Sequence, residues 1–325
     1  MYKSLIYQQF GAPTKVLKLI ERIETTLAPD ELLVKMKFTP INPSDLIPMT
    51  GAYSHRTPLP AFAGYEGVGR VVAVGSAVDE AWLGRRVLPL QSEGTWQEFV
   101  RVNQQFAVPV LPEIEDVTAA QLYINPLTAW LICIQLLHLS KNQVLVLNAA
   151  GSAIGRIFTQ LSQILGFRFI GIVRNDDATA DLLNLGAEQV INSSSEDVAS
   201  LLRKIGVDAA IDCIGGSEGT LLAQAVQENG KFHTLGLLSG RQIDWQTVSQ
   251  LPIEVGLFHL RYWNEKLSAT EFQTTMLKIQ ELVRSEQLLI ENPIEIFDFE
   301  DFQTALVRNE NFKGKILLDF DKKSY

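Results

Sequence analysis

The pattern of apolar and polar residues changes about a third of the way along the chain. Up to about residue 120, short apolar or alternating runs such as 32–38 are broken by prolines, and a block of glycines and valines follows at 64–75. Short runs bounded by turn residues predict β-strands. We therefore expect the first part of the chain to form an antiparallel, barrel-like domain.

From about Leu122 the pattern predicts strands that alternate with helices. The unbroken apolar run at 144–147 predicts a buried strand, apolar positions recur at helical spacing over 154–165, and 169–173 predicts the next strand. Further strands are predicted at 189–191, 209–214 and 231–236. Strands separated by helices form parallel sheets. The expected fold class is therefore α/β, with a doubly wound parallel sheet.

The last part of the chain differs again. A helix is predicted at 271–285, a strand at 293–297, a short helix at 299–307 and a final strand at 315–318. Because the final strand has no partner nearby in the sequence, we expect it to return to the first domain. This predicts a strand-rich domain at 1–121, a doubly wound domain at 122–268 and a return to the first domain at 269–325.

Small residues at 149–152 lie between the first buried strand and its helix. Such a turn lets the backbone approach a pyrophosphate, and the helix start offers unpaired N–H groups and a positive dipole end. If Gly155 is the last glycine of a G-x-G-x-x-G fingerprint, Ala150 and Ser152 occupy the two earlier positions. We expect a dinucleotide across this turn; the alternative is a plain β-α-β unit with small packing residues.

The end of the second strand, Val173-Arg174-Asn175, indicates which dinucleotide binds. NAD-binding units carry an acidic residue there, which holds the ribose 2′-hydroxyl. Arg174 can offer its guanidinium to a 2′-phosphate, which favours NADPH over NADH. Asp176 and Asp177 come slightly late, although a two-residue shift of the strand end would restore the acidic role.

Composition excludes several classes of function. The net charge of −9 over 325 residues argues against a sequence-independent nucleic-acid binder, which needs clustered positive charge. Cys133 and Cys213 lie in apolar runs without a second pair, as buried thiols in a reducing compartment do. The apolar region 122–139 contains polar residues and a proline, and 1–7 lacks the features of a signal peptide. We expect a cytoplasmic protein that does not span a membrane.

Several motifs together resemble one family along nearly the whole chain. They are GYEGVGRVVAVG at 64–75, INPLTAW at 124–130, LGAEQVI at 185–191, DCIGG at 212–216 and GKILL at 314–318. As a set they are similar to the medium-chain dehydrogenases/reductases. The resemblance implies a GroES-like catalytic domain built from both chain ends and a central Rossmann cofactor domain, with the substrate between them. An exposed strand edge of the cofactor domain implies a homodimer.

The resemblance is to the branches without zinc. Zinc-dependent members carry Gly-His-Glu where this chain has Gly64-Tyr65-Glu66, and a cysteine ligand where it has residues 42–45. Cysteine thiolates or imidazoles are the ligands that zinc needs, and the two cysteines here are isolated. The four histidines, His55, His138, His233 and His259, show no ligand spacing. We therefore expect no metal.

Among these branches, INPSDLIPMTGAYS at 41–54, EGTWQEFV at 93–100 and IVRNDD at 172–177 resemble the mitochondrial-type 2-enoyl thioester reductases, with quinone oxidoreductases next. This implies that Tyr53 donates a proton. It also implies an NADPH site lined by Asn42, Asn125, Thr128, Ser152, Ala153, Ile154, Gly155, Arg174, Asn175, Asp176, Leu235, Gly236, Leu237, Leu238, Phe258, His259, Leu260 and Lys315. Two departures are Gly151-Ser152-Ala153 in place of asparagine, serine and glycine, and His259 in place of tryptophan.

The expected reaction is reduction of a C=C bond conjugated to a carbonyl. The cofactor supplies a hydride, and a phenol such as Tyr53 can bond the developing oxyanion or protonate carbon. Alternatively, Tyr53 is a turn aromatic and water gives the proton; Asn42 and Asp45 similarly have the simpler role of capping a turn. The rival functions are a quinone reductase and a non-catalytic NADPH-binding sensor. The sequence does not indicate the acceptor or its chain length.

Overall fold

The computed structural model describes residues 1–23, 26–290 and 293–321. These residues form two compact units. The first comprises Met1–Ile124, Leu267–Ser285 and Ile290–Tyr325, and the second comprises Asn125–Lys266 and Glu286–Leu289. The two ends of the chain thus build one unit and the middle builds the other. We call them the terminal unit and the central unit.

A six-stranded sheet forms the middle of the central unit, and all of its strand pairs are parallel. In spatial order its strands are β11 (Gln189–Asn192), β10 (Arg168–Val173), β9 (Val144–Leu147), β12 (Val207–Asp212), β13 (Val226–Thr234) and β14 (Glu254–Leu257). The order reverses at β9, from which the chain proceeds first to β10 and β11 and then to β12 on the opposite side. The expected doubly wound sheet is therefore confirmed.

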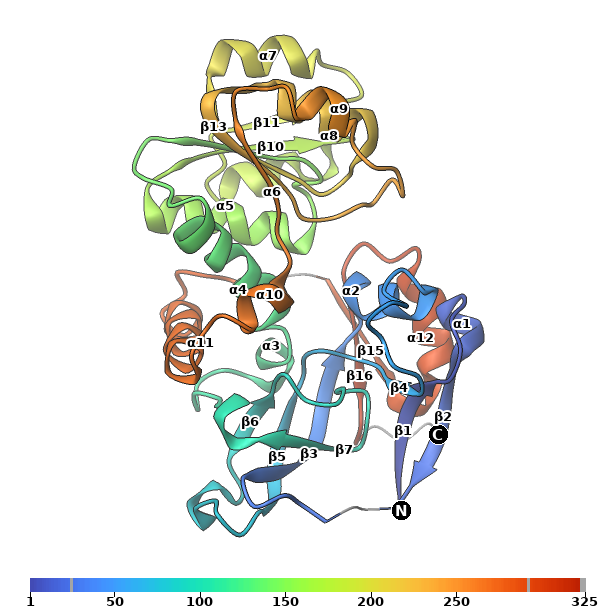
Figure 1. Cartoon of the computed structure of the whole chain (residues 1–325). Helices are drawn as coiled ribbons and strands as arrows, with labels where there is room; N and C mark the ends of the chain where they lie inside the picture. The colour runs from blue at the N-terminus through green and yellow to red at the C-terminus, as the bar shows by residue number, and fades with distance from the viewer. Residues whose placement is uncertain (24–25, 291–292, 322–325) are drawn as a thin grey trace. The chain divides into compact units, whose positions relative to one another are not determined.

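Helices cover both faces of this sheet (Figure 1). On one face, α7 (Val198–Ile205), α8 (Gly216–Gln224) and α9 (Trp245–Val248) share an apolar core with the strands. On the other, α5 (Ala153–Leu165) packs on β10, and α6 (Thr179–Asn184) packs on β11. Both faces are buried, which explains why the strands read as continuous apolar runs rather than as alternation.

The terminal unit contains two sheets. A three-stranded sheet has the order β2 (Leu17–Arg22), β1 (Tyr2–Tyr7) and β4 (Ala61–Phe62). The larger sheet has the order β15 (Ile294–Asp298), β16 (Lys315–Asp319), β3 (Glu31–Pro40), β5 (Val68–Val74), β6 (Arg86–Pro89) and β8 (Ala107–Pro109), with β7 (Phe99–Asn103) on β3. β16 runs antiparallel to β3, so the final strand joins the first part of the chain. Only β15 and β16 pair in parallel among the described strands of this unit.

A tight packing contact in the terminal unit fixes the segment that precedes β5. Trp96 is fully buried, and its indole N–H donates to the Pro40 carbonyl at 3.2 Å. Gly64 has a φ of +88°, and a Cβ there would lie 2.2 Å from the Trp96 ring. Only glycine therefore fits, which explains the glycine before Tyr65 and Glu66.

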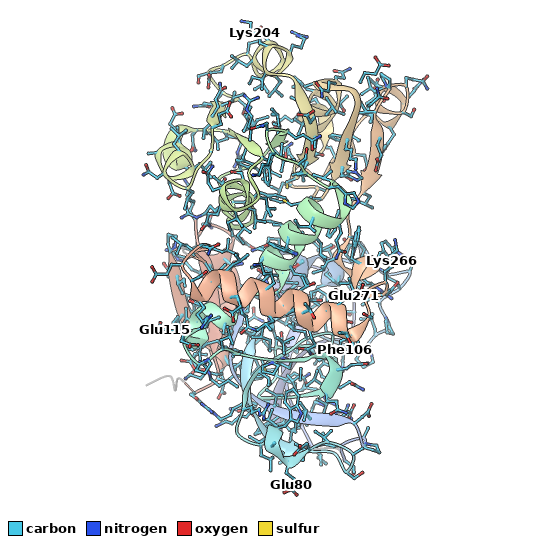
Figure 2. All side chains as sticks on the ribbon, turned by 90° about the vertical axis from the view of Figure 1, so that its left-hand side faces the viewer. Glu80, Phe106, Glu115, Lys204, Lys266 and Glu271 are labelled. Carbon is cyan, nitrogen blue, oxygen red and sulfur yellow. The ribbon has the colours of Figure 1, made fainter. Side chains whose placement is uncertain are left out.

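The longest described helix, α11 (Ala269–Arg284), packs on the terminal unit. Ser268 and Glu271 form a capping box at its start, so the helix begins two residues before the expected position 271. Phe272 of α11 lies edge-on to Phe106 with ring centres 6.0 Å apart. Glu271 and Phe106 are labelled in Figure 2.

The apolar region 122–139 forms α4 (Ile124–Leu131) followed by a π-helical turn over Ile132–Leu136. Helix α8 ends at Gln224, because β13 already begins at Val226. In the described parts of the chain, no helix has the length and hydropathy that crossing a membrane requires.

Candidate nucleotide and catalytic sites

The small-residue turn lies at the carboxyl end of β9, where the sheet order reverses. Ser152 caps α5, and its hydroxyl accepts a bond from the Gly155 N–H at 3.4 Å. The first N–H groups of a helix have no partners within the helix, and the dipole is positive there. The turn thus places the N-terminus of the 13-residue helix α5 at the point where the strand order reverses, which is where doubly wound sheets bind ligands.

Gly155 allows the helix to approach the turn closely. A Cβ at this position would lie 2.1 Å from the Ala150 carbonyl oxygen, so no other residue fits without movement of the backbone. This close packing of helix against strand is the role of the last glycine in dinucleotide-binding turns. Ala149 adopts a φ of +52°, a conformation that non-glycine residues seldom take. The turn therefore shares the close helix packing of dinucleotide-binding turns, although alanine and serine replace two glycines.

Arg174 is the first residue after β10, so the strand end is not shifted. Its side chain is exposed, and the guanidinium has no hydrogen-bond or ion-pair partner in the described parts of the chain. Asp176 instead accepts a bond from the Asn192 amide at 3.0 Å, and Asn175 caps the following turn. The Arg174 guanidinium is thus available where NAD-binding units carry a carboxylate. The carboxylate of Asp176 is already hydrogen-bonded to the Asn192 amide.

Two buried residues that the sequence reasoning missed organise the neighbouring strand ends. The Asn148 amide donates to Asp212 Oδ1 at 2.6 Å, and its oxygen accepts from the Cys213 N–H at 2.6 Å. Asp212 also accepts from the backbone N–H of Gly215 at 3.0 Å. Both residues directly end buried apolar runs, and a polar residue at that position is the signal that could have identified them.

The other expected cofactor residues of the central unit lie mostly at the same rim of the sheet. Residues 235–238 follow β13, and the N–H of Leu235 donates to the Asp212 carbonyl at 2.7 Å. Residues 258–260 follow β14; Phe258 is buried and stacks on Trp263, and His259 caps the short helix α10 (Leu260–Asn264). Asn125 and Thr128 come from α4 instead. Their contacts with a nucleotide stay predictions.

Tyr53 lies in the terminal unit, in the turn after the 3₁₀ helix η1 (Ile47–Thr50). Gly51 takes a φ of +88° at the end of η1 and lets the chain reverse. The Tyr53 side chain is half-buried, and the Arg56 guanidinium lies 4.0 Å from its ring centre. This is the distance of a cation–π contact, which holds the ring in place.

Asn42, Asp45, Glu66 and Lys315 form a buried cluster in the terminal unit, with each residue at most 5% exposed. Asn42 and Asp45 make the capping box of the short helix α2 (Pro43–Leu46), which is the simpler of their two expected roles, and a contact with ligand stays a prediction. The Asn42 amide donates to Glu66 Oε1 at 2.8 Å, and the Lys315 ammonium donates to Asn42 Oδ1 at 2.5 Å. The side chain that was expected to line the cofactor site is thus engaged inside the unit.

Burial dominates the electrostatics of this cluster. It raises the pKa of Asp45 to about 7, with Glu66 as a further cause and the N–H groups and Lys315 opposing the shift. It also raises the pKa of Glu66, against the opposing effect of the Lys315 ammonium and three N–H donors. Burial lowers the pKa of Lys315, and both carboxylates oppose that change. Three ionisable groups therefore share one buried space.

This cluster does not fit the zinc that the zinc-dependent members of the resembled family carry. In the described residues, no group of three or more His, Cys, Asp or Glu side chains could hold a metal ion. The Lys315 ammonium bonds Asn42 between the two segments that supply ligands in those enzymes, and an ammonium repels a cation.

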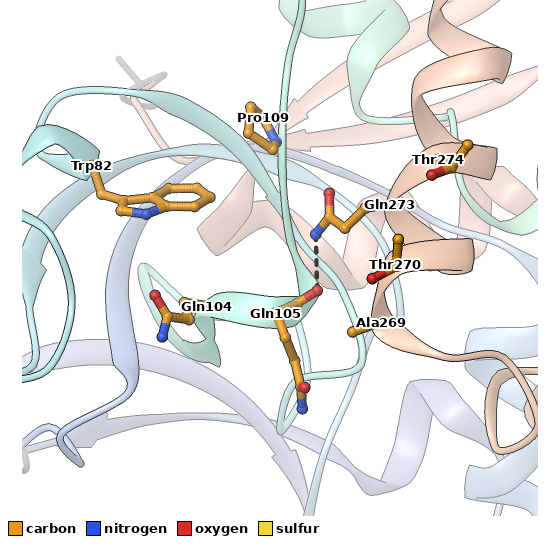
Figure 3. Close-up of a pocket in the computed structure, with 8 residues that line it drawn as sticks. All are labelled: Trp82, Gln104, Gln105, Pro109, Ala269, Thr270, Gln273 and Thr274. Atoms are coloured by element: carbon orange, nitrogen blue, oxygen red, sulfur yellow. Dashed lines mark hydrogen bonds between the residues drawn. The ribbon is translucent and has the colours of Figure 1, made fainter.

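A hollow of about 410 Å³ lies elsewhere on the terminal unit (Figure 3). Its lining residues are Trp82, Gln104, Gln105, Pro109, Ala269, Thr270, Gln273 and Thr274. Gln273 spans it by donating to the Gln105 carbonyl at 2.8 Å. None of the eight is titratable near neutral pH and none belongs to the predicted site, so the hollow offers no acid–base chemistry.

Comparisons with known proteins agree with this architecture. Residues 28–113 match the family model described as alcohol dehydrogenase GroES-like domain, and residues 153–265 match the one described as zinc-binding dehydrogenase. The chain is 32% identical over 315 residues to a mitochondrial enoyl-[acyl-carrier-protein] reductase of Arabidopsis thaliana, covering 94% of this chain and 84% of that protein.

Two solved structures extend the comparison. A putative NADPH:quinone reductase from Bacillus thuringiensis is 44% identical with a TM-score of 0.96, covering 100% of this chain and 99% of the other. A mitochondrial 2-enoyl thioester reductase heterodimer, Etr1p/Etr2p from Candida tropicalis, is 25% identical with a TM-score of 0.83, covering 98% and 99%. The chain therefore belongs to the medium-chain dehydrogenase/reductase family, among relatives that include enoyl thioester and quinone reductases.

Proposed function

We propose that this protein is an NADPH-dependent reductase of the C=C bond in enoyl thioesters or other α,β-unsaturated carbonyls. The observation that carries the cofactor choice is Arg174 directly after β10, which is exposed and whose guanidinium has no partner among the described residues. The reaction rests on Tyr53 within the 41–54 motif and on relatives named as enoyl reductases. Fold alone does not fix the reaction, so the site residues carry the proposal.

The residues present fit the cofactor. The turn at 152–155 would hold its pyrophosphate and Arg174 its 2′-phosphate, and bound NADPH supplies a hydride. Tyr53 would hydrogen-bond the carbonyl oxygen as negative charge develops there, or protonate the α-carbon. A well-placed proton donor of this kind is worth about 10²–10⁴-fold in rate.

A quinone reductase is the second candidate, and a specific observation favours it. The solved structure with 44% identity carries the name putative NADPH:quinone reductase. A quinone accepts the same hydride at a different acceptor, so the nucleotide site alone does not separate the two activities. A non-catalytic NADPH-binding sensor is the remaining alternative.

One experiment separates these functions. Purified protein is mixed with NADPH and, in turn, crotonyl thioester, a simple enone and a benzoquinone, and the loss of NADPH absorbance is followed. We expect the highest kcat/KM with the enoyl thioester. Turnover of the quinone alone would establish the second candidate, and tight NADPH binding without turnover of any acceptor would establish a sensor.

The division of labour in the chain belongs to the same proposal. Segments 1–121 and 269–325 would form the catalytic domain, and 122–268 the cofactor domain.

β14 has only β13 as a neighbour in its sheet, which supports a homodimer through that edge, and size-exclusion chromatography with light scattering tests it. The two buried free cysteines support a reducing compartment, for which we propose the cytoplasm, although the Arabidopsis thaliana relative is named mitochondrial.

A further inference from the structure

The buried cluster around Asn42 contains two carboxyl groups and one amine, with no metal site. We propose that Lys315 is a positioning residue: its ammonium is the internal cation that balances Glu66 and, through Asn42, fixes the segment that carries Tyr53. The charge balance stands on the geometry of the terminal unit alone. The effect on turnover rests on the function proposed above.

Lys315 reaches the cluster from the far end of the chain. It is the first residue of β16, and its backbone N–H donates to the Pro293 carbonyl at 2.8 Å. The next residue, Ile316, accepts a bond from the Ile41 N–H at 2.9 Å, which sets β16 beside the residue before Asn42. The ammonium then bonds Asn42 Oδ1, across 273 positions of sequence. The backbone pairing thus delivers the cation to one defined atom.

Both carboxyl groups are surrounded by donors. Glu66 accepts the Asn42 amide at 2.8 Å and the backbone N–H groups of Tyr123 and Ile124 at 3.1 and 2.8 Å. Asp45 accepts the N–H groups of Asn42 at 2.8 Å and Tyr65 at 3.0 Å. Burial raises the pKa of both groups and these donors oppose that shift, so a negative charge retained on Glu66 needs a buried positive partner. Lys315 is the cation that the Asn42 contact places there.

Asn42 transmits this arrangement toward Tyr53. Its two side-chain groups are held by Glu66 and Lys315, and its backbone begins α2. A four-residue helix has no stability of its own, so its position depends on this start. The chain continues directly through η1 and Gly51 to Tyr53. A shift of about 1 Å in a reacting group can cost about 10²-fold in rate.

A double-mutant cycle tests the charge balance without any assay of activity. Unfolding by urea at neutral pH is compared for the wild type, Lys315→Met, Glu66→Gln and the double variant, with the exposed Lys18→Met as the control. We expect each single variant to lower the folded-to-unfolded ratio at least tenfold. The double variant should lose at least fivefold less than the product of the two single losses, because removing both charges leaves neither unpaired. Multiplicative losses would overturn the proposal.

Lys315→Arg keeps the charge and should retain a folded protein with most of the turnover. If Lys315→Met does not fold, recovery of a folded protein in the double variant with Glu66→Gln supports the balance, and failure of that variant as well overturns it. These outcomes do not depend on which acceptor the enzyme reduces.

Chemical rescue tests the link to catalysis. In Lys315→Ala, ethylammonium should raise kcat at least fivefold, while ethanol, a neutral molecule of similar size, should not. The Kd for NADPH is measured in parallel by fluorescence quenching, because Lys315 is also one of the expected cofactor residues. Equal rescue by ethanol, or a lost NADPH affinity with kcat unchanged, would overturn the positioning role. A wild type that turns over no acceptor would refute the proposed function while the unfolding cycle still decides the charge balance.

Discussion

At the residue scale, Tyr53 carries the chemistry of the proposed reduction. Its ring is held by Arg56 at 4.0 Å in a turn whose reversal depends on Gly51. Tyr53→Phe keeps the ring and removes only the hydroxyl. We expect turnover of enoyl thioesters to fall at least tenfold, because the proton donor is lost, while the Kd for NADPH changes little. Unchanged turnover in steady-state kinetics would mean that water supplies the proton.

Arg174 is the residue that we propose selects the cofactor, also at the residue scale. Arg174→Ala should weaken NADPH binding by about 1.5–3 kcal/mol, the range for hydrogen bonds to a charged group, and NADH binding hardly at all. Arg203→Ala is the matched control, since it removes an exposed arginine from α7 in the same unit. Titration calorimetry with both nucleotides measures the difference, and equal losses for NADPH and NADH would contradict the 2′-phosphate assignment.

At the scale of elements, the small-residue turn at 149–152 depends on how closely α5 packs against β9. Gly155→Ala would place a methyl group 2.1 Å from the Ala150 carbonyl oxygen, which forces the helix outward. Overpacking of this kind costs about 1–3 kcal/mol. We expect a lower urea midpoint together with weaker binding of both NADPH and NADH. Wild-type binding of both nucleotides would show that they do not lie on this turn.

Asp45 in the capping box of α2 should make the free energy of unfolding depend on pH. Burial raises the pKa of Asp45 to about 7 in the folded protein, from about 4 in an unfolded chain. The folded protein therefore binds the Asp45 proton more tightly than the unfolded chain does. The contribution of this group to the free energy of unfolding is full below about pH 4 and is lost as the pH rises through 7. The full shift corresponds to at most roughly 4 kcal/mol.

Asp45→Asn should therefore remove part of the fall in unfolding free energy between pH 4 and pH 7. Asp79→Asn is the control, because Asp79 caps an exposed 3₁₀ turn with a bond of 2.8 Å to the Ala81 N–H. Urea unfolding at several pH values measures the slope. An unchanged slope in Asp45→Asn would show that this carboxyl group does not hold its proton near neutral pH.

At the scale of the whole molecule, the two chain ends make one unit and the middle makes another. NADPH that binds only the folded protein stabilises it by about 2.7 kcal/mol at a concentration of 100 times Kd. We expect the urea midpoint to rise accordingly with NADPH and to rise less with NADH at the same concentration. Equal shifts with both nucleotides would remove the preference that Arg174 is expected to provide.

Much of this fold was predictable because its determinants are local. Continuous apolar runs separated by helical periods predict a doubly wound parallel sheet, which is confirmed, whereas the order of its strands around β9 comes only from the structure. The turn at Ser152, its glycine and the cation at the end of β10 are also local in sequence. The assignment of cofactor contacts to individual residues stays a prediction.

What the sequence by itself determined is therefore the class of each segment and the chemistry of its turns, since strand, helix and cap preferences act over a few neighbouring residues. Only the tertiary structure decided which distant polar groups meet. Asn148 reaches Asp212 across 64 positions, and Lys315 reaches Asn42 across 273. No local pattern specifies such contacts, because they arise from strand pairing and burial, which bring charge partners together only after the chain has folded.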